Sequence, residues 1–93
     1  MAASPQALHG FVTGLVQGVY FRAATQKMAL ELGILGWVRN TDDGRVEVLL
    51  QGSPEALADM RVWLQRGPQH ARVENVQLGD VAPQAFKDFS IRS

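Results

Sequence analysis

The chain has 93 residues, with nine basic and nine acidic side chains and no cysteine. This length suits one domain with its own core. Because the charges are balanced and scattered, the chain has no basic stripe that could bind nucleic acid or an anionic membrane surface. The absence of cysteine excludes disulfides and thiolate chemistry. Residues 1–6 lack the features of a secretory signal, and no apolar run is long enough to span a membrane. We therefore expect one cytoplasmic domain over residues 1–93, with a flexible start at residues 1–6.

The first half of the chain predicts two strands around a helix. Residues 8–13 (LHGFVT) are typical of a strand, with Leu8 and Val12 on one face. Side chains at helical spacing follow after a glycine-containing segment, and Gly33 stands where a left-handed helix cap is favourable. Residues 36–41 (GWVRNT) are again typical of a strand. The side chains that predict the helix are Thr25, Met28, Ala29 and Leu32.

A hairpin and a second helix come next. Residues 42–44 (DDG) are a strong turn signal, and alternation over residues 45–51 (RVEVLLQ) predicts a strand with one buried face. Ser53 can cap the following helix, with Pro54 and Glu55 in its first turn. We expect this helix to turn Leu57, Met60 and Leu64 toward the core and to end at Gly67-Pro68.

The last part of the chain predicts two more strands. Residues 71–78 suit a strand, but their apolar alternation changes phase near Asn75. A bulge there, or a later strand start, accounts for this change. Residues 89–91 (FSI) predict a short terminal strand.

This order of elements predicts the fold. The sequence β-α-β-β-α-β, followed by a short fifth strand, is that of the ferredoxin-like split βαβ arrangement. The fold class is α+β, with two helices on one face of a mainly antiparallel sheet. In this topology the third strand lies between the first two.

Residues 14–22 (GLVQGVYFR) predict a cradle for a single phosphate group. Glycines allow the backbone to curl so that successive N–H groups point toward one site. The helix that follows adds unpaired N–H groups, and Arg22 adds a planar cationic fork that suits phosphate oxygens. The spacing is neither that of the nucleotide P-loop nor that of the dinucleotide fingerprint. The alternative is an ordinary glycine turn between a strand and a helix.

The predicted topology brings Asn40 toward this cradle. Strands one and two run parallel, so their carboxyl ends share one edge of the sheet, roughly 10 Å apart. Arg22 ends the cradle and Asn40 ends the second strand, so we expect the two side chains to converge. The alternative is that Asn40 only hydrogen-bonds the turn that follows it.

Two segments resemble the signatures of one known family. Residues 14–22 are similar to the first signature of the acylphosphatases, and residues 36–46 (GWVRNTDDGRV), with Gly52 beyond, are similar to the second. The resemblance implies a ferredoxin-like fold and the hydrolysis of acyl phosphates to a carboxylate and inorganic phosphate. It implies that Arg22 binds the phosphate and that Asn40 orients the attacking water.

The chemistry of acyl phosphates suits this set of residues. The motifs offer no cysteine, histidine or carboxylate as nucleophile or base, but a carboxylate leaving group needs little protonation. Catalysis then requires neutralised phosphoryl oxygens and one aligned water, without metal or cofactor. We expect Arg22 and Asn40 to be catalytic. The expected substrate-binding residues are Gln17, Gly18, Val19, Tyr20, Phe21 and Arg22.

The other chemistry-bearing side chains are interpreted as structural. His9 and His70 lack metal-type spacing, and Trp37 and Trp63 suit packing. Tyr20 and Phe21 either shield the cradle or pack beneath the first helix. Asp42 and Asp43 are interpreted as turn residues.

Three alternatives to a free-standing enzyme remain open. An RNA-recognition module needs aromatic residues on its central strands, and residues 45–51 contain none. A phosphate or carboxylate sensor would keep the cradle without turnover, against which both Arg22 and Asn40 count. An acylphosphatase-like domain of a larger enzyme is the third, although Met1 and the full set of elements favour a separate protein. The zero net charge and the absence of an apolar patch in the pattern predict a monomer.

Overall fold

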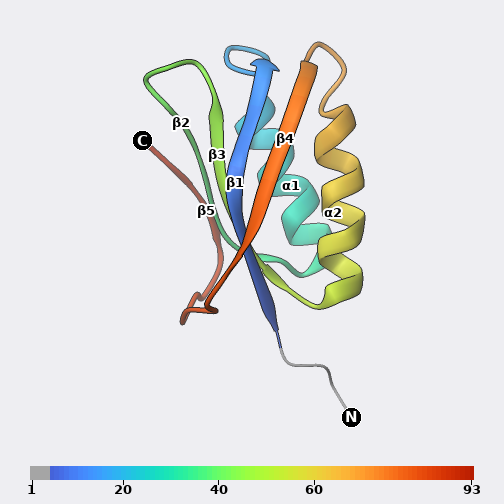
Figure 1. Cartoon of the computed structure of the whole chain (residues 1–93), viewed down its shortest axis with the longest axis vertical. Helices are drawn as coiled ribbons and strands as arrows, with labels where there is room; N and C mark the ends of the chain where they lie inside the picture. Colours follow the sequence, from blue (N-terminus) through green and yellow to red (C-terminus); the bar gives the residue numbers. More distant parts are fainter. Residues whose placement is uncertain (1–4) are drawn as a thin grey trace.

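The computed structural model describes residues 5–93, which form one five-stranded sheet and two helices. Figure 1 shows both helices on the same side of the sheet, which leaves the other side open. This arrangement confirms the predicted ferredoxin-like fold. Of the segment expected to be flexible, residues 1–4 lie outside the described residues and Gln6 begins the first strand. The elements are β1 (Gln6–Leu15), α1 (Phe21–Leu32), β2 (Leu35–Asn40), β3 (Val46–Gly52), α2 (Pro54–Arg66), β4 (Arg72–Val81) and β5 (Phe89–Arg92).

The strand order is β4-β1-β3-β2-β5. β3 pairs antiparallel with both β1 and β2, so β1 and β2 run parallel with β3 between them, as predicted. β5 adds to the outer edge of β2 in parallel. The short terminal strand therefore lies next to the strand that carries Asn40.

β4 contains the bulge that its sequence predicted. Thr13 pairs with Asn75 and Gly14 pairs with Val73, so Glu74 is the extra residue. Both β1 and β4 are longer than predicted, with ten residues each. Their extended pairing supplies backbone hydrogen bonds that a sequence pattern alone does not reveal.

The core lies between the sheet and the helices. The alternation in β1 and β3 places Val12, Val48 and Leu50 on the helix side, where they are fully buried. Met60 and Leu64 of α2 meet them, as the helical spacing predicted. The full cluster comprises Leu8, Val12, Val16, Phe21, Ala29, Ile34, Val38, Val46, Val48, Leu50, Ala56, Leu57, Met60, Leu64 and Phe89.

The helix ends follow the predicted signals. The Ser53 hydroxyl accepts a hydrogen bond from the N–H of Ala56 at 3.1 Å, which begins α2. Gly33, with φ at 72°, ends α1 in the left-handed conformation that favours glycine. These caps set where α1 ends and where α2 begins.

The prediction that β3 has one buried face is wrong, because both of its faces are buried. On the open side of the sheet Glu47 is only 9 % exposed. His9 of β1 contacts its carboxylate at 2.6 Å and Arg39 of β2 donates to it at 2.5 Å. Glu47 is therefore buried beneath long side chains from both neighbouring strands, which supply its charged and hydrogen-bonding partners.

This ion cluster predicts how stability depends on pH. Burial raises the pKa of Glu47, but the hydrogen bonds from His9 and Arg39 outweigh it and hold the pKa below its usual 4.5. The unfolded chain therefore binds the proton more readily, so the stabilisation is complete above pH 4.5 and is lost as the pH falls through the folded pKa. We expect Glu47→Gln to lower the free energy of unfolding at pH 7 by about 1 to 3 kcal/mol.

Urea unfolding of both proteins between pH 3 and pH 7 measures this effect. The difference between the wild type and Glu47→Gln should shrink as the pH falls. A difference that stays constant with pH would contradict the ion-cluster origin.

Candidate active site

Residues 14–20, which run from the end of β1 to the start of α1, form a curled segment because three of them have positive φ. The values are 129° at Gly14, 73° at Gly18 and 60° at Tyr20. At Gly14 a Cβ atom would lie 2.1 Å from the Arg72 carbonyl oxygen, so the close approach of β4 also requires glycine there. This curl brings the end of β1 round to the N-terminus of α1 and confirms the turn that the glycines predicted.

A cavity of about 410 Å³ lies beside this curled segment. It is lined by side chains of the segment and the first turn of α1, by the last residue of β2 and by one residue of β5. Arg22 and Asn40 both line it, as the topology predicted. The lining residues are Val16, Gly18, Tyr20, Phe21, Arg22, Ala23, Asn40 and Ile91.

Sheet register explains why Asn40 reaches this cavity. Val46 of β3 pairs with Val12 of β1 on one side and with Asn40 of β2 on the other. The three residues therefore form one row across the sheet, just before β1 ends and the curled segment begins. Two inter-strand spacings, about 10 Å, separate the outer members of this row.

Arg22 lines the cavity and has no acidic partner within residues 5–93. The three ion pairs within residues 5–93 are those of His9, Arg39 and Arg45. The first turn of α1 contains no acidic residue, and no side chain caps its N-terminus. A cation and uncapped helix N–H groups together produce a positive potential that suits an anion.

The Asn40 side chain has a buried oxygen without a partner. Within residues 5–93, its Oδ1 atom is the one buried side-chain N or O atom that has no hydrogen bond. Such an atom normally costs stability, and it belongs to a residue that lines the cavity.

The hairpin after Asn40 is held by other residues. The Arg45 N–H donates to the Thr41 hydroxyl at 3.0 Å, and the Arg45 side chain donates to Asp43 at 2.9 Å. The Arg45 and Thr41 hydrogen bonds lower the pKa of Asp43 to about 2. Asp43 therefore acts as a turn residue, as predicted, and the alternative that Asn40 bonds the turn finds no support in these contacts.

Gln17 links the curled segment to this hairpin. Its Nε2 atom donates to the carbonyl oxygens of Thr41 at 2.8 Å and Arg45 at 2.9 Å. The side chain therefore points toward the hairpin, whereas Val19 packs against the core. Neither side chain lines the cavity, so only the backbone N–H groups of these two residues can serve a ligand there.

The remaining lining residues divide into buried and exposed ones. Phe21 is 1 % exposed and its ring packs on Trp63 at 5.9 Å between centroids, so Phe21 packs rather than shields. Tyr20 stays exposed.

Val16, Ala23 and Ile91 were not predicted as site residues. Ile91 reaches the cavity because β5 pairs with β2, and no signal in the sequence predicts that pairing.

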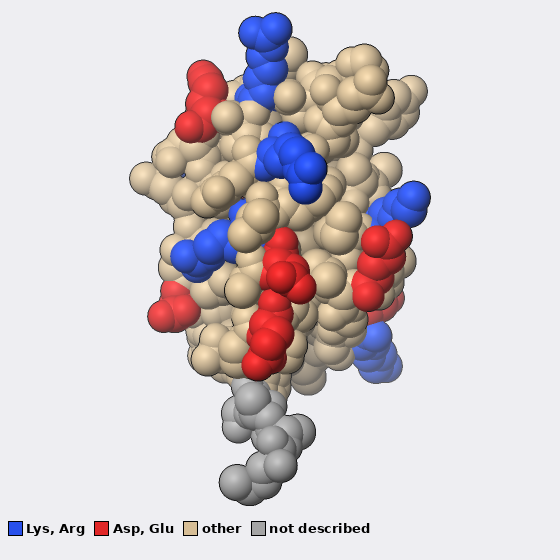
Figure 2. Space-filling view, turned by 90° about the vertical axis from the view of Figure 1, so that its right-hand side faces the viewer, with Lys and Arg blue, Asp and Glu red and all other residues tan. Residues whose placement is uncertain are grey.

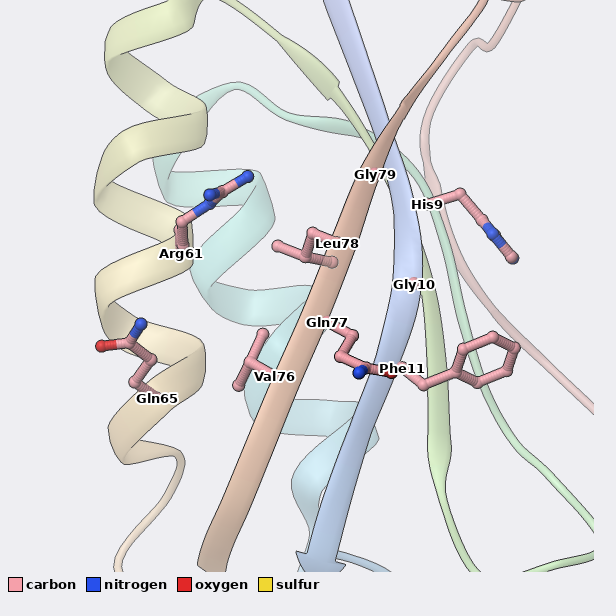
Figure 3. Close-up of a pocket in the computed structure, with 9 residues that line it drawn as sticks. All are labelled: His9, Gly10, Phe11, Arg61, Gln65, Val76, Gln77, Leu78 and Gly79. Atoms are coloured by element: carbon pink, nitrogen blue, oxygen red, sulfur yellow. The ribbon is translucent and has the colours of Figure 1, made fainter.

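A second cavity, of about 500 Å³, lies at the β4 edge of the sheet. Figure 3 shows Arg61 and Leu78 on the helix side of the strands, whereas His9 and Phe11 lie on the open side. The polar groups of this cavity therefore do not converge on one point. The His9 ring is also engaged by Glu47 at 2.6 Å.

Acidic and basic side chains share the face of the molecule that Figure 2 shows. On the face in Figure 2, acidic and basic side chains are interspersed over the surface, so this face presents no single-sign patch. Within residues 5–93, no three His, Asp or Glu side chains gather in a way that could hold a metal ion. No helix of this part of the chain is long and apolar enough to cross a membrane.

The fold and the site define a small α/β sandwich with a cavity that suits an anionic ligand.

Comparisons with known proteins agree with this class. The acylphosphatase family model matches residues 8–91. The acylphosphatase of Nitrosococcus oceani is 51 % identical over 81 residues, which cover 87 % of this chain and 91 % of that protein. The chain therefore belongs to the acylphosphatase family, and it is a hydrolase of that family.

Solved structures show the same fold. The structure of an acylphosphatase from Coxiella burnetii matches with a TM-score of 0.92 at 36 % identity, and covers 95 % of this chain and 93 % of its own. That of acylphosphatase from Bacillus subtilis matches with a TM-score of 0.91 at 33 % identity, and the shares are 97 % and 100 %. Both proteins support the ferredoxin-like assignment.

Proposed function

We propose that this acylphosphatase holds the phosphoryl group of an acyl phosphate with Arg22 and the N–H groups of residues 17–22, while Asn40 orients the attacking water. The observation that carries the proposal is the pairing of two unsatisfied groups in one cavity. The Arg22 guanidinium has no anion, and the Asn40 Oδ1 atom has no donor, within residues 5–93. A phosphoryl group satisfies the first and a water O–H satisfies the second.

The proposed reaction is one displacement at phosphorus. The water oxygen bonds to phosphorus while the bond from phosphorus to the acyl oxygen breaks, and its electron pair leaves with the carboxylate. A phosphoryl oxygen takes the proton of the water, because an amide cannot accept it at neutral pH. The protein contributes charge neutralisation and alignment, which are the main requirements of phosphoryl transfer.

Leaving-group chemistry explains why no acid is needed. A carboxylate is stable as it departs, whereas an alkoxide from a phosphate monoester needs a proton donor. The described lining residues contain no carboxyl group and no histidine that could act as that donor. The site therefore suits phosphate groups that are already activated.

Phosphate release from benzoyl phosphate, a simple aryl acyl phosphate, tests this function. With a chelator present, we expect the wild type to hydrolyse benzoyl phosphate and to leave an alkyl phosphate monoester intact over the same period. Asn75→Ala, an exposed asparagine outside the cavity, serves as the control for substitution itself. A wild type that binds phosphate but releases none from benzoyl phosphate would instead support the sensor alternative.

The physiological setting stays a prediction. A cytoplasmic, monomeric protein that acts on a free small molecule is consistent with the described fold. Light scattering of the purified chain measures the oligomeric state directly.

A further inference from the structure

Tyr20 combines an unusual backbone with an unusual side-chain position. Within residues 5–93 it is the one non-glycine residue with positive φ, at 60°. Tyrosine gains nothing from this conformation, which glycine or asparagine adopts more readily. Its side chain is 85 % exposed, so it contributes little to the core. A costly backbone that carries an exposed aromatic ring favours a role in ligand contact.

Tyr20 lines the cavity to which Arg22 and Asn40 also belong. Ile91 of β5 lines the same cavity and is 40 % exposed. Both therefore offer apolar surface that a bound molecule can cover. They lie far apart in the sequence, and Ile91 reaches this cavity because β5 pairs with β2.

The charge of the cavity restricts what lies beyond the phosphate. Among the described lining residues, Arg22 is the only charged one, and the proposed function assigns it to the phosphoryl group. A second anionic group on the substrate would find no cation in the lining. The volume of about 410 Å³ lies within the range of small-molecule sites and leaves room beside a phosphate.

From these observations we infer that Tyr20 and Ile91 form an acyl-group contact that favours uncharged aromatic or bulky aliphatic acyl phosphates. The inference rests on the proposed function, because it assigns the phosphate end to Arg22. Burial of apolar surface from the acyl group and from both side chains supplies the preference. Tyr20 and Ile91 act on substrate choice, and neither takes part in the displacement at phosphorus.

Binding of non-hydrolysable analogues tests the inference without turnover. We expect calorimetry to show that the wild type binds benzoylphosphonate about tenfold more tightly than acetylphosphonate. Tyr20→Gly and Tyr20→Asn suit the positive φ and so keep the backbone. Both should reduce this ratio to about twofold. Ile91→Ala should reduce it in part, while Leu30→Ala, an exposed apolar residue outside the cavity, should leave it unchanged.

The outcomes separate this inference from the proposed function. Equal affinities for the two phosphonates in the wild type, or an unchanged ratio in both Tyr20 variants, would overturn the acyl-group contact. An equal loss for both phosphonates and for inorganic phosphate would also overturn it, because Tyr20 would then act at the phosphate end. The expected ratios in a protein that does not hydrolyse benzoyl phosphate would refute the proposed function alone.

Discussion

Replacement of Arg22 with alanine is expected to lower kcat/KM for benzoyl phosphate by about 10³-fold or more, the size of effect seen when a positioned arginine is removed from phosphoryl transfer. The guanidinium neutralises phosphoryl charge in the bound substrate and in the transition state. Inhibition by inorganic phosphate should therefore weaken together with turnover. Steady-state kinetics with phosphate as competitor measures both effects.

Stability separates this functional loss from a folding defect. Arg22 lies in the first turn of α1, where the helix dipole disfavours a cation, and it has no ion pair within residues 5–93. Arg22→Ala should therefore melt at the same temperature as the wild type or slightly higher. Arg61→Ala, an exposed arginine on α2, is the matched control and should keep full activity.

Arg22→Lys refines the test. It keeps the charge but loses the planar fork, so we expect activity between those of the wild type and Arg22→Ala. Phosphate inhibition that is unchanged in Arg22→Ala would show that the loop N–H groups bind the anion without the guanidinium.

Replacement of Asn40 with alanine is expected to lower kcat by about 10²-fold, by analogy with other positioned polar groups. Inhibition by inorganic phosphate should change little, because the proposed role of Asn40 is to hold water and not the phosphoryl group. Single-turnover rates with benzoyl phosphate, compared with phosphate inhibition constants, measure this separation. Asn75→Ala is the matched control.

The stability of Asn40→Ala, like that of Arg22→Ala, should not fall together with its activity. The Asn40 Oδ1 atom is buried without a donor, so its removal also removes an unsatisfied polar group. We expect Asn40→Ala to be as stable as the wild type or more stable. Full turnover by Asn40→Ala would refute the water-orienting role, and a large loss of phosphate affinity would reassign Asn40 to anion binding.

Local signals predicted most of the fold. The alternation around Val48, the serine cap at Ser53 and the glycine at Gly33 each reflect interactions within a few residues, so the sequence reveals them. The convergence of Arg22 and Asn40 was also predictable, since the order of elements determines which strand ends share an edge. The phase change near Asn75 correctly indicated a bulge.

Long-range pairing accounts for what was missed. The burial of Glu47 depends on His9 and Arg39, which belong to the two neighbouring strands. The position of Ile91 depends on the pairing of β5 with the outer edge of β2. The sequence pattern predicts Gln17 as a loop residue. Its side chain nevertheless donates hydrogen bonds to two hairpin carbonyl oxygens, 24 and 28 positions further along the chain. Such partners follow from register and loop closure, which local patterns do not determine.

The row formed by Val12, Val46 and Asn40 has a consequence for folding kinetics. The two halves of the site face each other only after β3 has inserted between β1 and β2, and the pairing of Val46 with Val12 closes a chain segment of more than thirty residues. Closure of such segments is slower than helix formation, because its entropic cost comes before any contact rewards it. Recovery of activity during refolding would therefore follow completion of the central sheet, and helix content would return earlier.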